Sequence, residues 1–193
     1  MSADRRGVFV VALPLVIAIH FATAALGQKA SATEAADTTM KKDYRAVHTS
    51  EEFTFLANAR LGALFPLFGA DRERVWATGW EPRFVWPAPP FDRAGMVFQI
   101  SHGEKIATWV NTVFDPVGGR VQYVYVVPEV VATVITLHLR ARGTVTEVAV
   151  RYERTSLSAE SDVTVKEMAE HDRVAGLEWA RQINAFIAGR GTH

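Results

Sequence analysis

The chain has 193 residues, of which 49% are hydrophobic and 22% are charged, a balance typical of one globular domain with an appendage rather than of a disordered chain. Its formal net charge is zero, and a domain without a basic excess lacks the electrostatic surface that binds nucleic acid or an anionic membrane. It contains no cysteine, which excludes disulfides, thiolate metal sites, cysteine nucleophiles and lipid attachment through cysteine.

The first 27 residues have the three parts of a secretory signal. Arg5 and Arg6 provide a positive start, an apolar run covers residues 8–19, and small residues follow it. Cleavage after Ala24 or after Gly27 fits this pattern. The sequence therefore predicts that the chain is exported.

An uncleaved membrane anchor is the alternative, because an apolar stretch of this length is long enough to span a bilayer. Anchoring would then run through residues 8–27, and the positive-inside rule would keep Arg5 and Arg6 in the cytoplasm. A buried helix of the domain fits less well, because the run has no polar face. Signal and anchor both predict a domain outside the cytoplasm, periplasmic or membrane-anchored.

Residues 28–40 are rich in Ala, Ser and Thr and have almost no large apolar side chains. Such a segment cannot bury enough surface to offset the entropy of ordering it, so we predict a flexible linker. The predicted organisation is a signal peptide or membrane anchor over residues 1–27, the linker over 28–40, and one folded domain over 41–189.

The first half of the domain mixes strand and helix signals. Alternating apolar and polar residues predict a strand over residues 45–56. Asn58 is then a suitable N-cap for a short helix over residues 60–65. A further helical turn or two over residues 71–77 leads into the aromatic-rich segment 80–87.

Five more strands follow, separated by short turns that favour an antiparallel meander. They are predicted over residues 96–102, 106–114, 120–127, 130–140 and 144–154. In the last strand, Val148, Val150 and Tyr152 share one face, so one side of the sheet is dry and the other wet. In the second of the five, two sets compete for the inner face: Trp109, Asn111 and Val113 against Thr108, Val110, Thr112 and Phe114.

A long amphipathic helix ends the domain. Residues 164–167 have a capping-box pattern, although a start near Ser158 is also compatible with the sequence. Gly189 and Gly191 are predicted to terminate it. Its apolar stripe consists of Met168, Ala175, Trp179, Ile183 and Phe186.

These elements have one natural assembly, in which the sheet curls and its dry face wraps the terminal helix. The predicted fold class is therefore α+β of the helix-grip kind: a curved antiparallel sheet around a long C-terminal helix, preceded by an N-terminal apolar signal helix. The space left between helix and sheet would be a ligand cavity.

Three stretches of the domain also carry a resemblance to a known group of proteins. They are Leu64-Phe65-Pro66-Leu67-Phe68-Gly69 with Glu73, Trp76, Gly79-Trp80 and Pro82; Glu104 with Trp109; and Glu170-His171 with Trp179 and Phe186. These stretches, within residues 44–187, are similar to a bacterial branch of the START/Bet v 1-like superfamily, also called SRPBCC or polyketide cyclase/dehydrase-like.

This resemblance implies a helix-grip fold with a deep apolar cavity. Members bind lipids, sterols, polyketides or plant hormones, and some catalyse cyclisation, dehydration or hydroxylation. The superfamily has no universal catalytic motif that could be carried over to this chain. An export signal would be a departure, since many members are cytoplasmic.

Aromatic residues on the central strands and the last helix are the main candidates for ligand binding. They could line the cavity, with the tyrosine hydroxyls directed at a ligand, or they could be ordinary core residues. The candidate ligand-binding residues are Trp109, Tyr123, Tyr125, His138 and Trp179.

No constellation in the sequence indicates catalysis or a metal. His102, His138 and His171 are scattered without an HxH or HExxH spacing, and there is no GxSxG motif. We therefore assign no catalytic residue, metal or cofactor. Glu129, at a strand end near the expected cavity mouth, is either a gate or acid, or a solvated turn residue.

The sequence thus predicts a protein that binds a small hydrophobic ligand, lipid-like or aromatic, in an internal cavity outside the cytoplasm. It leaves open whether a reaction follows. A cyclase/dehydrase-type enzyme would use His138, Glu129 or a tyrosine as acid or base, with two such groups converging in the cavity. A structural or partner-binding domain would instead have a collapsed core and an exposed patch over residues 80–86. The predicted partner is a small hydrophobic molecule and not nucleic acid.

Overall fold

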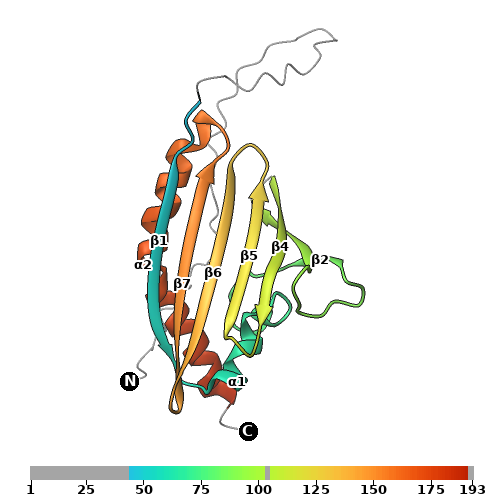
Figure 1. The fold of residues 1–193 in the computed structure, drawn as a ribbon, viewed down its shortest axis with the longest axis vertical. Coiled ribbons are helices and arrows are strands. Elements are labelled where there is room, and N and C mark those ends of the chain that lie inside the picture. The colour runs from blue at the N-terminus through green and yellow to red at the C-terminus, as the bar shows by residue number, and fades with distance from the viewer. Residues whose placement is uncertain (1–43, 103–104, 191–193) are drawn as a thin grey trace, which may run out of the picture.

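The computed structural model describes residues 44–102 and 105–190. The predicted signal or anchor and the predicted linker lie outside these residues. Seven strands form one antiparallel sheet in the order β1-β7-β6-β5-β4-β3-β2 (Figure 1). The strands are β1 (His48–Ala57), β2 (Arg83–Trp86), β3 (Val97–His102), β4 (Lys105–Asp115), β5 (Arg120–Val127), β6 (Val131–Arg142) and β7 (Val145–Ser156).

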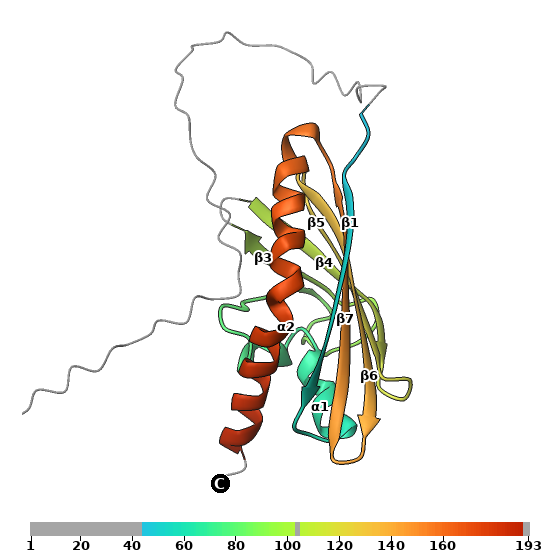
Figure 2. The same ribbon diagram turned by 90° about the vertical axis from the view of Figure 1, so that its left-hand side faces the viewer.

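The long helix α2 (Asp162–Arg190) runs along the inner face of the curved sheet (Figure 2). Between β1 and β2 the chain forms α1 (Leu61–Leu64) and the 3₁₀ helices η1 (Phe65–Phe68) and η2 (Arg72–Val75), and η3 (Ala159–Ser161) precedes α2. The predicted α+β helix-grip architecture is confirmed for the described residues. None of the helices described is both long and apolar enough to cross a lipid bilayer.

Strict alternation of side chains places the core between sheet and helix. In β7, Val148 and Val150 are fully buried, while Arg151 on the opposite face is exposed. Helix α2 covers this inner face with Met168, Ala175, Trp179 and Ile183, all of them buried. The predicted apolar stripe therefore packs on the predicted dry face of the sheet.

Strand β4 resolves the ambiguity of its inner face through a β-bulge. The pairing register with β5 shifts between Asn111 and Val113, and an extra residue in one strand reverses which side chains point inward beyond it. Trp109 and Asn111 are buried before the bulge, whereas Phe114 packs on Phe65 after it, with 4.9 Å between ring centroids. Each of the two competing sets is therefore correct for one part of the strand.

Of the two starts left open for the last helix, the one near Ser158 is confirmed, because the capping box joins Ser158 and Ser161 rather than Thr164 and Glu167. Two other predicted boundary residues were wrong. Arg60, not Asn58, is the N-cap of α1. The backbone N–H of Asn58 instead donates to Asn184 Oδ1 at 2.7 Å. Gly189 lies inside α2 rather than ending it.

Strand β2 was not predicted from the sequence. Its residues pair with β3 at the edge of the sheet, with Phe84 opposite Phe98. Pro82 and Pro87 flank this strand of four residues, and neither proline has an N–H group that could extend its pairing. Proline cannot donate a hydrogen bond to a neighbouring strand, so prolines in a sequence argue against a strand and are found at sheet edges.

Candidate ligand-binding site

A cavity of about 120 Å³ lies between the inner face of the sheet, η2 and α2. This is somewhat smaller than the roughly 150 Å³ apolar cavity that binds benzene, so a ligand enclosed here has at most about the size of one ring. The residues that line it are Glu73, Trp76, Ala77, Thr78, Trp80, Ile100, Trp109, Tyr123, Tyr125, Ile135, Leu137, Tyr152, Arg154, Met168, His171, Asp172, Ala175 and Trp179.

Interlocking aromatic rings make the walls of the cavity. Trp109 of β4 stacks on Tyr125 of β5 with 4.1 Å between centroids, and Trp80 meets Trp109 edge-on at 5.3 Å. Trp76 meets Trp179 of α2 edge-on at 5.7 Å. Such geometries are favoured between aromatic rings, so the walls are rigid.

Four of the five predicted ligand-binding residues line this cavity. Trp109, Tyr123, Tyr125 and Trp179 come together there from β4, β5 and α2. His138 does not, because it is exposed on the outer face of β6, one position after the buried Leu137. Contact of the four with a ligand remains a prediction.

Most polar atoms on these rings already have partners. Tyr123 donates its hydroxyl hydrogen to the Phe68 carbonyl at 2.8 Å, and Tyr125 accepts from Arg154. The Trp76 and Trp80 indoles donate to backbone carbonyls at 2.6 and 2.7 Å. Among the described residues, the indole N–H groups of Trp109 and Trp179 are buried with no acceptor (both rings line the cavity).

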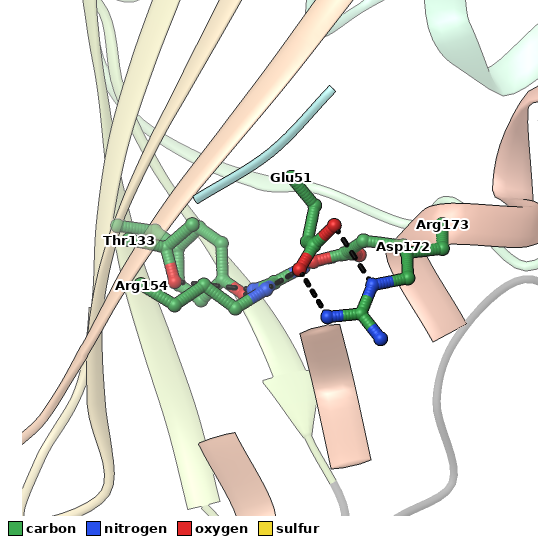
Figure 3. Close-up of polar contacts among 6 residues, drawn as sticks. Glu51, Thr133, Arg154, Asp172 and Arg173 are labelled. Atoms are coloured by element: carbon green, nitrogen blue, oxygen red, sulfur yellow. Dashed lines mark hydrogen bonds and ion pairs between the residues drawn. The ribbon is translucent and has the colours of Figure 1, made fainter. Parts of the chain in front are cut away.

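A buried ion pair, which the sequence analysis missed, crosses one side of the cavity. Arg154 of β7 donates to both carboxylate oxygens of Asp172 of α2, with Nε–Oδ2 at 2.6 Å and Nη2–Oδ1 at 2.9 Å (Figure 3). Both side chains are only 4% exposed. Arg154 Nη1 also donates to Thr133 Oγ1 at 3.2 Å, so a connected network holds the charge.

An exposed ion pair lies directly beside the buried one. Arg173, the next residue of α2, donates from Nη2 to Glu51 Oε1 of β1 at 2.8 Å (Figure 3). Asp172 therefore binds a cation on β7, and its neighbour Arg173 binds an anion on β1. Together the pairs fix α2 against β7 and β1.

The sequence did contain a signal for the buried pair. Arg154 continues the inward alternation of Val148, Val150 and Tyr152, and Asp172 lies four residues after Met168 on the apolar stripe of the helix. A charged residue at an inward-facing position is seldom left unpaired. One basic and one acidic residue at such positions therefore indicate a buried ion pair between them.

Glu73 of η2 is the second buried charged group at the cavity. Its side chain is 6% exposed, and within the described part of the chain no hydrogen bond to its carboxyl group is found. Burial raises the pKa of Glu73 well above its usual value of 4.5, and the Asp92 charge raises it further. From the sequence, Glu73 stands out only through the family resemblance, because a 3₁₀ turn has no periodicity that shows which of its side chains point inward.

The cavity meets the surface where its lining residues are exposed, at Thr78 after η2 and His171 on α2. Glu129 lies elsewhere, exposed in the β5–β6 turn with Lys105 Nζ 3.2 Å from its carboxylate. Across residues 44–102 and 105–190, no group of three or more His, Asp or Glu side chains could hold a metal ion.

Comparisons of the coordinates identify the fold. Norcoclaurine synthase from Thalictrum flavum matches with a TM-score of 0.58 and 10% identity, over 84% of this chain and 99% of that one. A protein from Rhizobium leguminosarum matches at 0.53 and 13% identity, over 75% and 97%. The Mll3558 protein from Rhizobium loti matches at 0.50 and 16% identity, over 72% and 99%.

The chain therefore has the helix-grip fold of the START/Bet v 1-like superfamily, as its sequence resemblance implied. In another structure, norcoclaurine synthase holds dopamine and hydroxybenzaldehyde. No protein-family model matches the sequence, and no curated protein is significantly similar to it.

Proposed function

We propose that this protein binds a small hydrophobic molecule, preferably one with an aromatic ring, in the cavity between sheet and helix α2. The observation that carries this proposal is the cavity itself, about 120 Å³ of space walled by stacked aromatic rings. A domain without a ligand gains stability by filling such a space with side chains. A retained cavity with an exposed rim at Thr78 and His171 is what a ligand site requires.

The fold supports this proposal independently. Norcoclaurine synthase, which shares the fold, holds two small aromatic molecules in one of its structures. The shared architecture leaves room beneath the terminal helix in this chain as well. We extend to this protein only the general capacity to hold a small apolar molecule.

We further propose that the protein acts outside the cytoplasm, on the strength of the signal or anchor pattern in residues 1–27. Cell fractionation of the full chain, with intact-mass analysis of the product, tests this. The expected result is an exported protein, either shortened after Ala24 or Gly27 or retained in the membrane at full length. Full-length protein in the cytoplasm would contradict export.

The experiment for ligand binding is organic extraction and mass spectrometry of the purified protein. Ala175 lines the cavity, whereas its neighbour Val174 is exposed. Ala175→Leu should fill the space and reduce the recovered ligand about tenfold or more, and the control Val174→Leu should leave recovery unchanged. Absence of any small molecule from the wild-type protein and from protein incubated with aromatic compounds would refute the proposal.

An acid–base enzyme is a second candidate, favoured by one observation. His138 and Glu129 lie outside the cavity, but the unpaired Glu73 carboxyl group and Tyr152 both line it. Burial, with the Asp172 charge, raises the pKa of Tyr152, and the Glu73 charge adds to this effect. If the recovered compound changes mass on incubation with wild-type protein but not with Glu73→Gln, the protein is an enzyme.

The structural or partner-binding alternative finds less support. Val85, Trp86 and Phe91 are exposed, and the Arg93 guanidinium lies 5.1 Å from the Trp86 ring and 5.4 Å from the Phe91 ring. Trp80, however, is half-buried and lines the cavity. The collapsed core that this alternative requires differs from the cavity found beneath α2.

A further inference from the structure

Glu73 differs from the two other buried residues with a formal charge that line the cavity. Arg154 and Asp172 neutralise each other through two hydrogen bonds. Glu73 is nearly as buried, at 6% exposed against 3% for each of the other two, and no hydrogen bond to its carboxyl group is found among the described residues. A buried carboxylate without a partner is costly, and such groups commonly mark a site where a ligand supplies the partner.

The charges around Glu73 determine which partner fits. Within the described cavity lining the formal charges are those of Glu73, Arg154 and Asp172, so ionisation of Glu73 leaves one unmatched negative charge. Asp92, on the loop after β2, adds a second negative charge nearby. A cation is therefore attracted to this end of the cavity and an anion such as a fatty acid is repelled.

The aromatic walls favour the same kind of ligand. The faces of tryptophan and tyrosine rings attract cations, and the recognition of organic ammonium groups in proteins relies on cages of such rings. Trp76, Trp80, Trp109 and Trp179 all line this cavity together with Glu73. The unsatisfied indole N–H groups of Trp109 and Trp179 are donors that an oxygen atom elsewhere on the ligand could accept from.

We propose that the cavity recognises a small aromatic amine in its protonated form, with the Glu73 carboxylate as the counter-ion of the ammonium group. This inference rests on the proposed function and specifies its ligand class. The cavity volume limits the enclosed part of the ligand to about one ring, so any side chain has to be short.

Binding of an ammonium ion should also release a proton. Without ligand, burial and the Asp92 charge raise the pKa of Glu73 and favour its neutral form. The ionisable groups that face it are Asp92, Tyr123, Tyr152, His171 and the Arg154–Asp172 pair. A bound cation favours ionised Glu73, so the proton leaves as the ligand enters.

The test uses the full chain and three probes of similar size and different charge: phenethylamine, 2-phenylethanol and 3-phenylpropionate. Quenching of tryptophan fluorescence reports binding, since four tryptophans line the cavity. Phenethylamine should bind about tenfold or more tighter than 2-phenylethanol, and 3-phenylpropionate should bind weakest. Glu73→Gln should abolish the preference for the amine, and the exposed control Glu129→Gln should retain it.

Proton release provides a readout that needs no variant. Calorimetry of the wild-type chain in buffers of different ionisation enthalpy, between about pH 5 and about pH 8, should show release of a proton with phenethylamine and none with 2-phenylethanol. Equal affinity for amine and alcohol, or no proton release, would overturn the amine inference while alcohol binding sustains the proposed function. If none of the three probes binds, the amine inference is refuted, and ligand extraction decides the proposed function separately.

Discussion

Arg154 and Asp172 place two formal charges inside an apolar core, where each is tolerated only because of the other. Neither residue is exposed enough for water to solvate it, and the bidentate geometry uses the fork shape of the guanidinium group. Such a pair adds little net stability compared with apolar residues of the same size, but the loss of one partner is severe. The pair joins β7 to α2 at one defined position.

Replacement of Asp172 by Ala should lower the free energy of unfolding by about 3–5 kcal/mol, because Arg154 would remain charged and buried without a partner. The double variant Arg154→Met/Asp172→Leu should recover much of this loss. Urea unfolding measures both. The matched control is Arg151→Ala in the same strand, whose exposed pair with Glu52 should contribute less than about 1 kcal/mol. Equal costs at positions 151 and 172 would contradict the argument.

Glu73 should make stability depend on pH in a predictable direction. Its folded-state pKa lies above the unfolded value near 4.5. Its contribution is therefore fully present below about pH 4.5 and is lost as the pH rises through the folded pKa. Since glutamine does not titrate, the stability of Glu73→Gln relative to wild type should increase over that pH range. Thermal unfolding at a series of pH values measures the difference.

Glu51 provides the control of opposite sign. The hydrogen bond from Arg173 lowers the pKa of Glu51 below 4.5. Its stabilisation is present above the unfolded pKa and is lost as the pH falls through the lowered one. Glu51→Gln should therefore be less stable than wild type at neutral pH, and the two should converge in acid. If both variants followed the same trend, the assigned pKa directions would be wrong.

At the scale of elements, the strands were predictable because each has one dry and one wet face. The expected boundaries of β3 to β7 lie within a few residues of those observed. Strand β2 and the bulge in β4 were not predicted, because neither has a periodicity that the sequence displays. Strand β2 has four residues between prolines, and the bulge at Asn111–Val113 depends on how β5 pairs with β4. Sequence alternation alone cannot indicate where pairing slips by one residue.

Gly176 determines how closely helix α2 approaches strand β1. A Cβ atom at this position would lie 2.9 Å from Phe53 Cδ2 and 3.2 Å from Phe53 Cβ. Gly176→Ala should therefore push helix and strand apart and cost about 1–3 kcal/mol, despite the better helix propensity of alanine. The control Gly62→Ala has no atom within 4 Å of the added Cβ and should be neutral or slightly stabilising. Urea unfolding of both variants distinguishes a packing effect from a propensity effect.

At the scale of the whole molecule, cavity and fold are linked through stability. A ligand that binds only the folded state stabilises it by about 2.7 kcal/mol at a concentration of about 100 times its Kd. For a domain of this size, this should raise the Tm by about 5 to 10 °C. The compound recovered from the protein should produce this shift in the wild-type chain and none in Ala175→Leu. A shift of equal size in the filled variant would place the binding site elsewhere.

The sequence by itself determined the layers of this protein. Periodicities of two and of about 3.6 residues are local properties, so a curved antiparallel sheet under a terminal amphipathic helix could be predicted, and Trp109, Tyr123, Tyr125 and Trp179 could be named as candidates for its cavity. The inner face of the strand that carries Trp109 was decided only by its pairing with β5. The tertiary structure decided the chemistry of the site. Glu73, Arg154 and Asp172 are distant in the chain and meet only when η2, β7 and α2 pack together, because burial and charge pairing belong to the assembled core and not to any one segment.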